Sequence, residues 1–522
     1  MAKPLSRRTF ALLSGGALVA APEIFRAQST SSKGTGLSEA FLNRLPSLME
    51  WANVPGTAVA TIKDGKPYWS RGFGVKKAGV SEAVDADTLF GAASLSKVVF
   101  SYAVHRMRDE KLIDIDRPLW QYLPYPDLPD VENAKLITAR HVLTHSSGLQ
   151  NWRFSREQHL EIAFKPGERF SYSGEGFYYL QRVVEKITDK GFEEYMRDRV
   201  LKPLGMVNST YLWNTEAETR VATGHNSRMV PYEMFNAQQG KRMLQIADEW
   251  KKPASTWQYD DVVRAQAIIN KDQPPLPNFL LPNTAGSLVT SVNEYAKFMI
   301  RLMETRRRDD LDLADATRRE MLTPQVRINS AVSWGLGVGL EIIDGRTLFW
   351  HWGDNGSFKC FVTANPARRS AVVMFTNSEN GLSIAPAIIR DATGSDHLAF
   401  TWIKYDAYDS PAMKFRKAIH NEGVEQALQL FAKQLKDGAI PENALNSAGY
   451  HLLWTKHNAD AIRIFRFNIE LHPGSANAFD SLGEGYLESG DKTQAIENYE
   501  RSLALDPQNS NAVAQLKKLK GS

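Results

Sequence analysis

The segment Phe90–Lys97 constrains the fold of this 522-residue chain most, because it leads two complementary side chains into a helix. Apolar residues follow it at helical spacing: Val98, Val99, Phe100, Tyr102, Ala103 and Met107. The pattern predicts a helix with Ser94 and Lys97 on one face. A buried lysine can shed its proton and take one from a serine hydroxyl, and the N–H groups at a helix start suit an oxyanion. The segment therefore predicts an activated serine, whereas Ser96 has no lysine three residues later.

Length and composition predict a globular protein with more than one domain. The length suggests roughly two to four domains, and 43% of the residues are hydrophobic and 23% charged. Because 63 basic residues nearly balance 59 acidic ones, we expect no nucleic-acid partner. The single cysteine, Cys360, cannot form an intramolecular disulfide, and its apolar neighbours predict a buried side chain without chemistry.

The N-terminus has the pattern of an export signal. Arg7 and Arg8 precede the short apolar run 11–21, which is typical of a twin-arginine signal. The run is too short for a permanent membrane span, and an accidental arginine pair on a disordered tail is the alternative. We expect residues 1–36 to be a signal peptide and flexible lead-in, and the protein to be periplasmic or secreted.

Several elements can be predicted along the chain. Alternating residues on both sides of Asp64-Gly65 predict a β-hairpin. Residues 213–282 have few periodic runs and are interpreted as surface insertion and loop. A helix is expected at 37–49, and strands at 334–340, 347–351, 358–364 and 371–376.

Two histidines are candidate ligands for a metal ion. His141 and His145 have the helical spacing of a zinc pair, but Val142 occupies the place where such a motif needs its glutamate. We therefore expect no metal. The favoured interpretation is a short helix that Thr138 caps and that ends at Gly148, with both histidines serving packing and hydrogen bonds.

Two further side chains are candidates for a site. Tyr172 precedes a predicted helix and can act as a proton shuttle beside a lysine, although a tyrosine there is commonly a packing residue. His351 lies at the end of a predicted strand and is a candidate site wall, although a lone histidine is usually structural.

Taken in order, these weak signals resemble one family. Over residues 37–400 the chain resembles the class C β-lactamase and penicillin-binding-protein superfamily, in its broad branch of esterases and peptidases. The motifs are Ser94–Lys97, Leu143–Leu149, Pro166–Ser173, Ala285-Gly286 and His351–Gly353. The resemblance implies an α+β fold of the β-lactamase/transpeptidase type. Its antiparallel sheet is flanked by helices, and the site lies between the sheet and a helical lobe.

The resemblance also implies catalytic roles. Ser94 would be the acylated nucleophile, with Lys97 as its proton partner. Tyr172 would be the base for acylation and deacylation. The backbone N–H groups of Ser94 and Asp354 would form the oxyanion hole, and no cofactor or metal is implied.

The implied substrate-binding residues include one departure from the family pattern. His351 and Gly353 belong to the strand triplet usually written Lys-Thr-Gly or His-x-Gly. Gly174 stands where the family's Tyr-x-Asn triplet has asparagine. Because that amide would bond the substrate and the lysine, its loss affects substrate scope and leaves the nucleophile chemistry in place.

The C-terminal segment 411–522 repeats itself with a period of 34. The matching pairs are Gly449 and Gly483, Ala461 and Ala495, Phe465 and Tyr499, Leu471 and Leu505, and Pro473 and Pro507. They resemble tetratricopeptide repeats, and Ala427 and Phe431 keep the register of a degraded third copy. Such a stack offers a concave surface to a protein partner, or it packs on the catalytic domain.

These observations favour an exported serine hydrolase that cleaves an ester or amide of a small molecule or peptide. One rival is a D-alanyl-D-alanine carboxypeptidase or β-lactamase with the same site. The other is a catalytically weak binding or sensor protein that works through its repeats. Retention of Ser94, Lys97 and Tyr172 argues against the second rival, because a binding site does not need proton-transfer groups.

Overall fold

A computed structural model describes residues 36–520, except 126, 129–131, 154–159, 228, 233–236, 270–280, 305–308, 404, 406, 409 and 455. The predicted export signal lies outside the described residues. The chain divides into two compact units, 1–405 and 406–522. No helix in the described ranges is long and apolar enough to cross a membrane.

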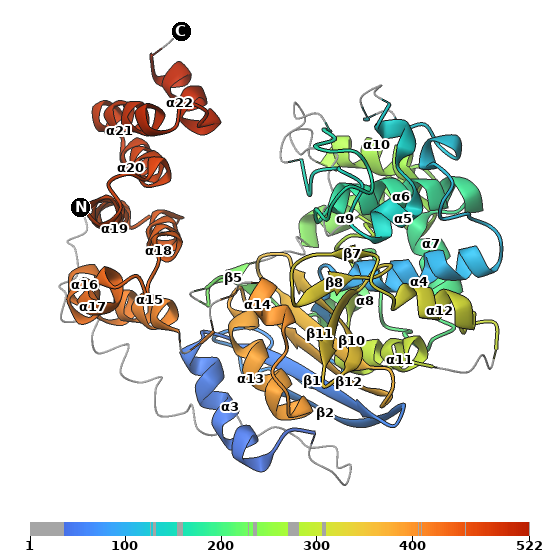
Figure 1. Cartoon of the computed structure of the whole chain (residues 1–522). Helices are drawn as coiled ribbons and strands as arrows, with labels where there is room; N and C mark the ends of the chain where they lie inside the picture. Colours follow the sequence, from blue (N-terminus) through green and yellow to red (C-terminus); the bar gives the residue numbers. More distant parts are fainter. Residues whose placement is uncertain are drawn as a thin grey trace. The chain divides into compact units, whose positions relative to one another are not determined.

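An eight-stranded antiparallel sheet forms the centre of the first unit, in the order β2-β1-β12-β11-β10-β9-β8-β7 (Figure 1). The predicted hairpin is present, and Asp64 and Gly65 both have the positive φ that its tight turn requires. The strands are β1 (Gly56–Lys63), β2 (Lys66–Gly74), β7 (Val326–Arg327), β8 (Val332–Trp334), β9 (Gly339–Ile343), β10 (Arg346–Asp354), β11 (Lys359–Asn365) and β12 (Ser370–Thr376).

Helices cover both sides of this sheet. Figure 1 shows α3 (Glu39–Trp51), α13 (Gly381–Thr393) and α14 (Ala399–Ile403) on one side, and α4 (Leu95–Asp109) and α11 (Val292–Leu302) on the other. Side chains alternate along β1, so Ala58, Ala60 and Ile62 join the same core as α4. The predicted α+β class, an antiparallel sheet with flanking helices, is confirmed.

A mostly helical lobe stands beside the sheet. It contains α5 (Ala139–Leu143), α6 (Gly174–Thr188), α7 (Phe192–Met196), α8 (Thr215–Arg220), α9 (Ala237–Glu249), α10 (Tyr259–Ile269) and the segment η3 (Arg197–Leu201). The shorter elements of this unit are α12 (Asp315–Met321), the 3₁₀ turns η1 (Leu119–Gln121), η2 (Ala134–Leu136) and η4 (Ala254–Thr256), and the strands β3 (Phe90–Gly91), β4 (Gly224–His225), β5 (Pro231–Tyr232) and β6 (Val289–Thr290).

The prediction of loop for residues 213–282 was wrong. The described part of this segment contains α8, α9 and α10, and the last two pack in one core with Trp213 and Trp257. Each helix contributes only a narrow apolar face, and tryptophans outside the helices complete the packing. The sequence of these helices therefore has too few apolar residues at helical spacing to predict them.

Two element boundaries also differ from prediction. The expected strand at 334–340 is interrupted, because β8 ends at Trp334 and β9 begins at Gly339, with Gly337 between them at a φ of +97°. Thr138 caps α5 as predicted and accepts a 3.2 Å hydrogen bond from the His141 N–H. That helix ends at Leu143, before Gly148.

The second unit is all helical and has its own apolar core. A side chain at Gly449 would overlap the Phe465 ring, and one at Gly483 would press on the Tyr499 ring, 34 residues later. The unit therefore repeats a helix-pair contact at the period of the sequence. Its helices are α15 (Pro411–Glu422), α16 (Val424–Leu430), α17 (Ala432–Lys436), α18 (Glu442–Trp454), α19 (Asn458–Leu471), α20 (Ala476–Ser489), α21 (Lys492–Leu505) and α22 (Ser510–Lys520).

Candidate active site

The turn before α4 presents Ser94 at the start of the helix. Ser94 is the N-cap residue, and Ala93 before it has a φ of +46°, which is unfavourable for a residue with a Cβ. Ser96 holds this turn, because its hydroxyl donates to the Ala93 carbonyl at 2.5 Å and accepts from the Leu288 N–H at 3.0 Å. Ser96 is therefore structural, and Ser94 is the partly exposed serine.

Lys97 lies next to Ser94, one turn into α4. Its Nζ lies 2.9 Å from the Ser94 Oγ and donates to the Ala285 carbonyl at 2.7 Å. The lysine is fully buried, and this burial lowers its pKa from 10.5 to about 7. Near neutral pH the amine can therefore hold a lone pair toward the serine hydroxyl.

The loop before α6 brings Tyr172 to the same place. Its hydroxyl is buried although part of its side chain is exposed, and its ring centroid lies 5.1 Å from the Lys97 Nζ. Burial raises the pKa of Tyr172, and an interaction with the Ser94 hydroxyl lowers it only in part. Tyr172 is therefore a protonated phenol at neutral pH.

His145 orients the Tyr172 loop. Its carbonyl accepts from the Ser171 N–H at 2.7 Å, and its Nδ1 accepts from the Ser173 N–H at 3.0 Å. Its ring stacks on Tyr172 with centroids 4.0 Å apart, and burial holds its pKa well below the ordinary value. The contacts agree with the expected packing and hydrogen-bonding role, and no cluster of three metal-ligating side chains occurs in the described part of the chain.

The end of β10 forms another wall. His351 is fully buried, and burial followed by the charge of Lys97 lowers its pKa to about 3. Its Nδ1 donates to the Trp352 carbonyl at 2.6 Å, which favours the protonated ring but does not outweigh the effect of burial on its pKa, so the imidazole is neutral at pH 7. A side chain at Gly353 would lie 2.2 Å from the Cys360 Sγ and 2.7 Å from the Ala92 carbonyl. Gly353 thus allows β10 to approach the turn that carries Ser94.

Asp354 ends β10, beside this contact. Its carboxylate binds the Lys359 ammonium and the Tyr405 hydroxyl, and its backbone is paired with Lys359 of β11. The Ser94 N–H has no bound acceptor among the residues described. The two N–H groups of the predicted oxyanion hole therefore lie on elements that Gly353 brings together.

Sequence reasoning missed three aromatic side chains at this site. Trp152 lies 5.7 Å from the Lys97 Nζ, Trp352 lies 4.9 Å from the Tyr172 ring, and Trp402 lies 5.1 Å from Trp352. Trp352 lies inside the His351–Gly353 motif but was given no role, and Trp152 and Trp402 lie outside the motifs. The run of aromatic residues around His351 was a signal for Trp352 alone.

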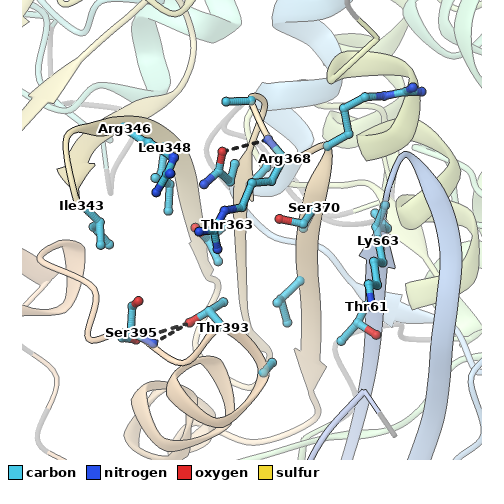
Figure 2. Close-up of a pocket in the computed structure, with 18 of the residues that line it drawn as sticks. Thr61, Lys63, Ile343, Arg346, Leu348, Thr363, Arg368, Ser370, Thr393 and Ser395 are labelled. Carbon is cyan, nitrogen blue, oxygen red and sulfur yellow. Dashed lines mark hydrogen bonds between the residues drawn. The ribbon is translucent and has the colours of Figure 1, made fainter. Parts of the chain in front are cut away.

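A cavity of about 750 Å³ lies away from these residues. Figure 2 shows Lys63, Arg346 and Arg368 among the residues that line it. Because β10 runs from Arg346 at the cavity to Asp354 at the site, the two places are separated by the length of that strand. None of the predicted site residues lines this cavity.

Together, the fold and the site define a class of protein in which a buried lysine lies beside a serine at the start of a helix, between an antiparallel sheet and a helical lobe. Residues 43–392 match the Beta-lactamase family, and the chain belongs to that family.

Individual relatives are more distant. The chain is 28% identical over 196 residues to "Penicillin-binding protein 4" of Amycolatopsis lactamdurans, a match that covers 35% of this chain and 51% of the relative. The chain thus spans about half the length of this curated relative.

Solved structures share the fold. A class C beta-lactamase superposes with a TM-score of 0.53 and 16% identity over 68% of this chain and 94% of its own. A D-alanine carboxypeptidase AmpC from Burkholderia cenocepacia superposes with a TM-score of 0.50 and 17% identity. The match covers 66% of this chain and 96% of that protein.

Proposed function

We propose that the protein is a serine hydrolase that cleaves an ester or amide through a Ser94 acyl-enzyme. The observation that carries this proposal is the 2.9 Å contact between the Ser94 hydroxyl and a buried Lys97 whose pKa is about 7. An amine in this state accepts a proton at neutral pH and so activates the hydroxyl beside it.

The proposed reaction has two steps. The Ser94 Oγ forms a bond to the acyl carbon while its proton passes to Lys97, and the backbone N–H groups of Ser94 and Asp354 stabilise the oxyanion. The bond to the leaving group then breaks, and the proton reaches that group through the Tyr172 phenol. Water releases the acid from Ser94 by the reverse proton path.

This division of roles differs from the one that the family resemblance implies. The resemblance assigns the base to Tyr172, but burial raises the pKa of its phenol. Lys97 is the better acceptor at neutral pH, because its pKa is about 7. Tyr172 then acts as a proton carrier that stays protonated between steps.

The electrostatics favour esters over β-lactams and D-alanyl peptides. His351 is neutral, and Gly174 has no side-chain amide, so the amide and carboxylate of a β-lactam lose two partners. Each lost hydrogen bond costs about 1 to 3 kcal/mol. We expect slow β-lactam hydrolysis alongside measurable cleavage of activated esters. A chromogenic cephalosporin turned over faster than p-nitrophenyl butyrate would promote the β-lactamase alternative.

A serine-directed phosphonate tests the nucleophile. The probe should label the wild-type protein at Ser94, as located by peptide mass spectrometry, and Ser94→Ala should remove the label. Ser81→Ala is the matched control, because Ser81 is an exposed serine that takes no part in the site, and it should remain labelled. Persistent labelling of Ser94→Ala would refute the assignment.

Two proposals concern the rest of the chain. We propose that Arg7 and Arg8 direct twin-arginine export, so changing both to lysine should leave the protein in the cytoplasm, and undiminished export would exclude the signal. We also propose that 411–522 is a tetratricopeptide-type module with a protein partner. The 34-residue recurrence of the glycine-to-ring contact supports this module.

A further inference from the structure

Trp152 occupies the space that a side chain at position 174 would fill. A Cβ at Gly174 would lie 2.1 Å from Cζ2 and 2.2 Å from Cη2 of the Trp152 ring. These distances are far shorter than any van der Waals contact, and the ring belongs to a rigid side chain. A side chain at position 174 and the observed Trp152 ring therefore exclude each other.

Two clamps fix the backbone around Trp152. On one side, the Gly174 N–H donates to the Asn151 Oδ1 at 2.9 Å, and the Glu175 N–H donates to the Asn151 carbonyl at 3.0 Å. On the other, the Arg153 guanidinium binds both oxygens of the fully buried Glu175, at 3.0 and 3.2 Å. The Trp152 ring is thus tied to the first turn of α6.

The ring contributes to an aromatic wall, which we define as Trp152, Phe170, Tyr172, Trp352 and Trp402. All five side chains are partly exposed. Trp152 and Tyr172 both flank the Lys97 Nζ, at 5.7 and 5.1 Å. Ring contacts of 4.9 to 5.7 Å continue the wall from Tyr172 through Trp352 and Trp402 to Phe170.

The charges around this wall do not suit an anionic acyl group. His351 is neutral, and the Lys359 ammonium is paired with the Asp354 carboxylate. Lys97 loses its charge near pH 7. Flat apolar rings with a neutral imidazole provide stacking and desolvation for an uncharged group.

We propose that Trp152 forms a binding subsite for an aryl acyl group, so that the preferred substrates are uncharged esters of aromatic carboxylic acids. The inference rests on the proposed Ser94 hydrolysis. In that mechanism the leaving alcohol takes its proton from Tyr172, so the Trp152 ring is assigned to the acyl side.

A matched pair of substrates tests the subsite. Vinyl benzoate and vinyl cyclohexanecarboxylate have the same leaving group and differ in whether the acyl ring is flat and aromatic. The wild-type protein should prefer the benzoate in kcat/KM. Trp152→Leu should reduce that preference about threefold to tenfold, the range expected for one aromatic pair, and Trp152→Phe should restore most of it.

Trp69→Leu is the control, because Trp69 is a partly exposed tryptophan on β2, away from the site. It should leave the substrate preference unchanged. An unchanged preference in Trp152→Leu, with vinyl acetate still hydrolysed, would overturn the subsite and leave the Ser94 proposal standing. If the wild-type protein cleaves none of the three esters and does not react with the phosphonate, both the Trp152 subsite and the Ser94 proposal are overturned.

A second pair of variants tests the exclusion between the two positions. Gly174→Ala should lower the melting temperature and the benzoate preference, because its Cβ displaces the Trp152 ring. When Gly174→Ala is added to the Trp152→Gly variant, the melting temperature should not fall below that of Trp152→Gly alone. Equal losses from Gly174→Ala in both backgrounds would contradict the assigned position of Trp152.

Discussion

Replacing Lys97 by methionine should abolish activity and yet stabilise the first unit below pH 7. Burial lowers the Lys97 pKa from 10.5 to about 7. Since each pKa unit corresponds to about 1.4 kcal/mol, keeping the side chain protonated costs the folded state about 5 kcal/mol. Methionine has a similar length and carries no charge, so Lys97→Met removes this cost.

The sign of the effect changes with pH. Below pH 7 the lysine is protonated in both the folded and the unfolded chain, so the full cost is present. Between pH 7 and 10.5 only the unfolded chain holds the proton, and the cost declines as pH rises. The variant also leaves the Ala285 carbonyl without its 2.7 Å donor, a loss of about 1 to 3 kcal/mol. We expect a net gain of about 2 to 4 kcal/mol near pH 6, and none or a small loss near pH 10.

Urea unfolding followed by tryptophan fluorescence can measure this difference. Of the 12 tryptophans, only Trp454 lies beyond residue 405, so the signal reports mainly on the first unit. Lys186→Met, at an exposed position on α6, is the control and should show no such crossover. A stability difference that does not change between pH 6 and 10, or a loss at pH 6, would refute a Lys97 pKa near 7.

Other consequences can be tested independently. In the wild-type protein kcat/KM should rise as pH increases through about 7, because the proposed base is neutral Lys97, and a flat profile would argue against that role. Tyr172→Phe should lower turnover by roughly 10² to 10⁴; unchanged turnover would make Tyr172 a packing residue. Glu175→Gln should destabilise the protein by about 1 to 3 kcal/mol, because it removes the buried charge that pairs with Arg153 while Arg153 keeps its other partner, Asp127, as urea unfolding would show. Truncation after residue 405 should leave a cooperatively folding hydrolase; lost cooperativity in calorimetry would tie the second unit to the first.

The predictable part of the site is the part that depends on local geometry. Ser94 and Lys97 meet because helical spacing places them on one face, and the Asp64-Gly65 turn forms because its φ angles suit those residues. The approach of Gly353 to the turn that carries Ser94 depends on packing between β10 and α4, and only the family resemblance indicated it.

Trp152 could not be placed from the sequence. It lies 22 residues before Gly174, in a segment without periodicity, and its position depends on the buried pair of Arg153 and Glu175. The absence of asparagine at position 174 was visible, but the ring that takes its space was not. Similarly, the helices within 213–282 were missed because tryptophans outside the helices complete their core.

The pairing of β1 with β12 determines when this protein can complete its central sheet. Thr57 of β1 is the partner of Thr376 of β12, so the first strand must wait for the last one to be synthesised. At about 5 to 20 residues per second, that wait is roughly 16 to 64 s on the ribosome. During this time an apolar strand has no native neighbour on one edge, which makes the nascent chain a candidate for chaperone binding and makes slow folding the expected behaviour.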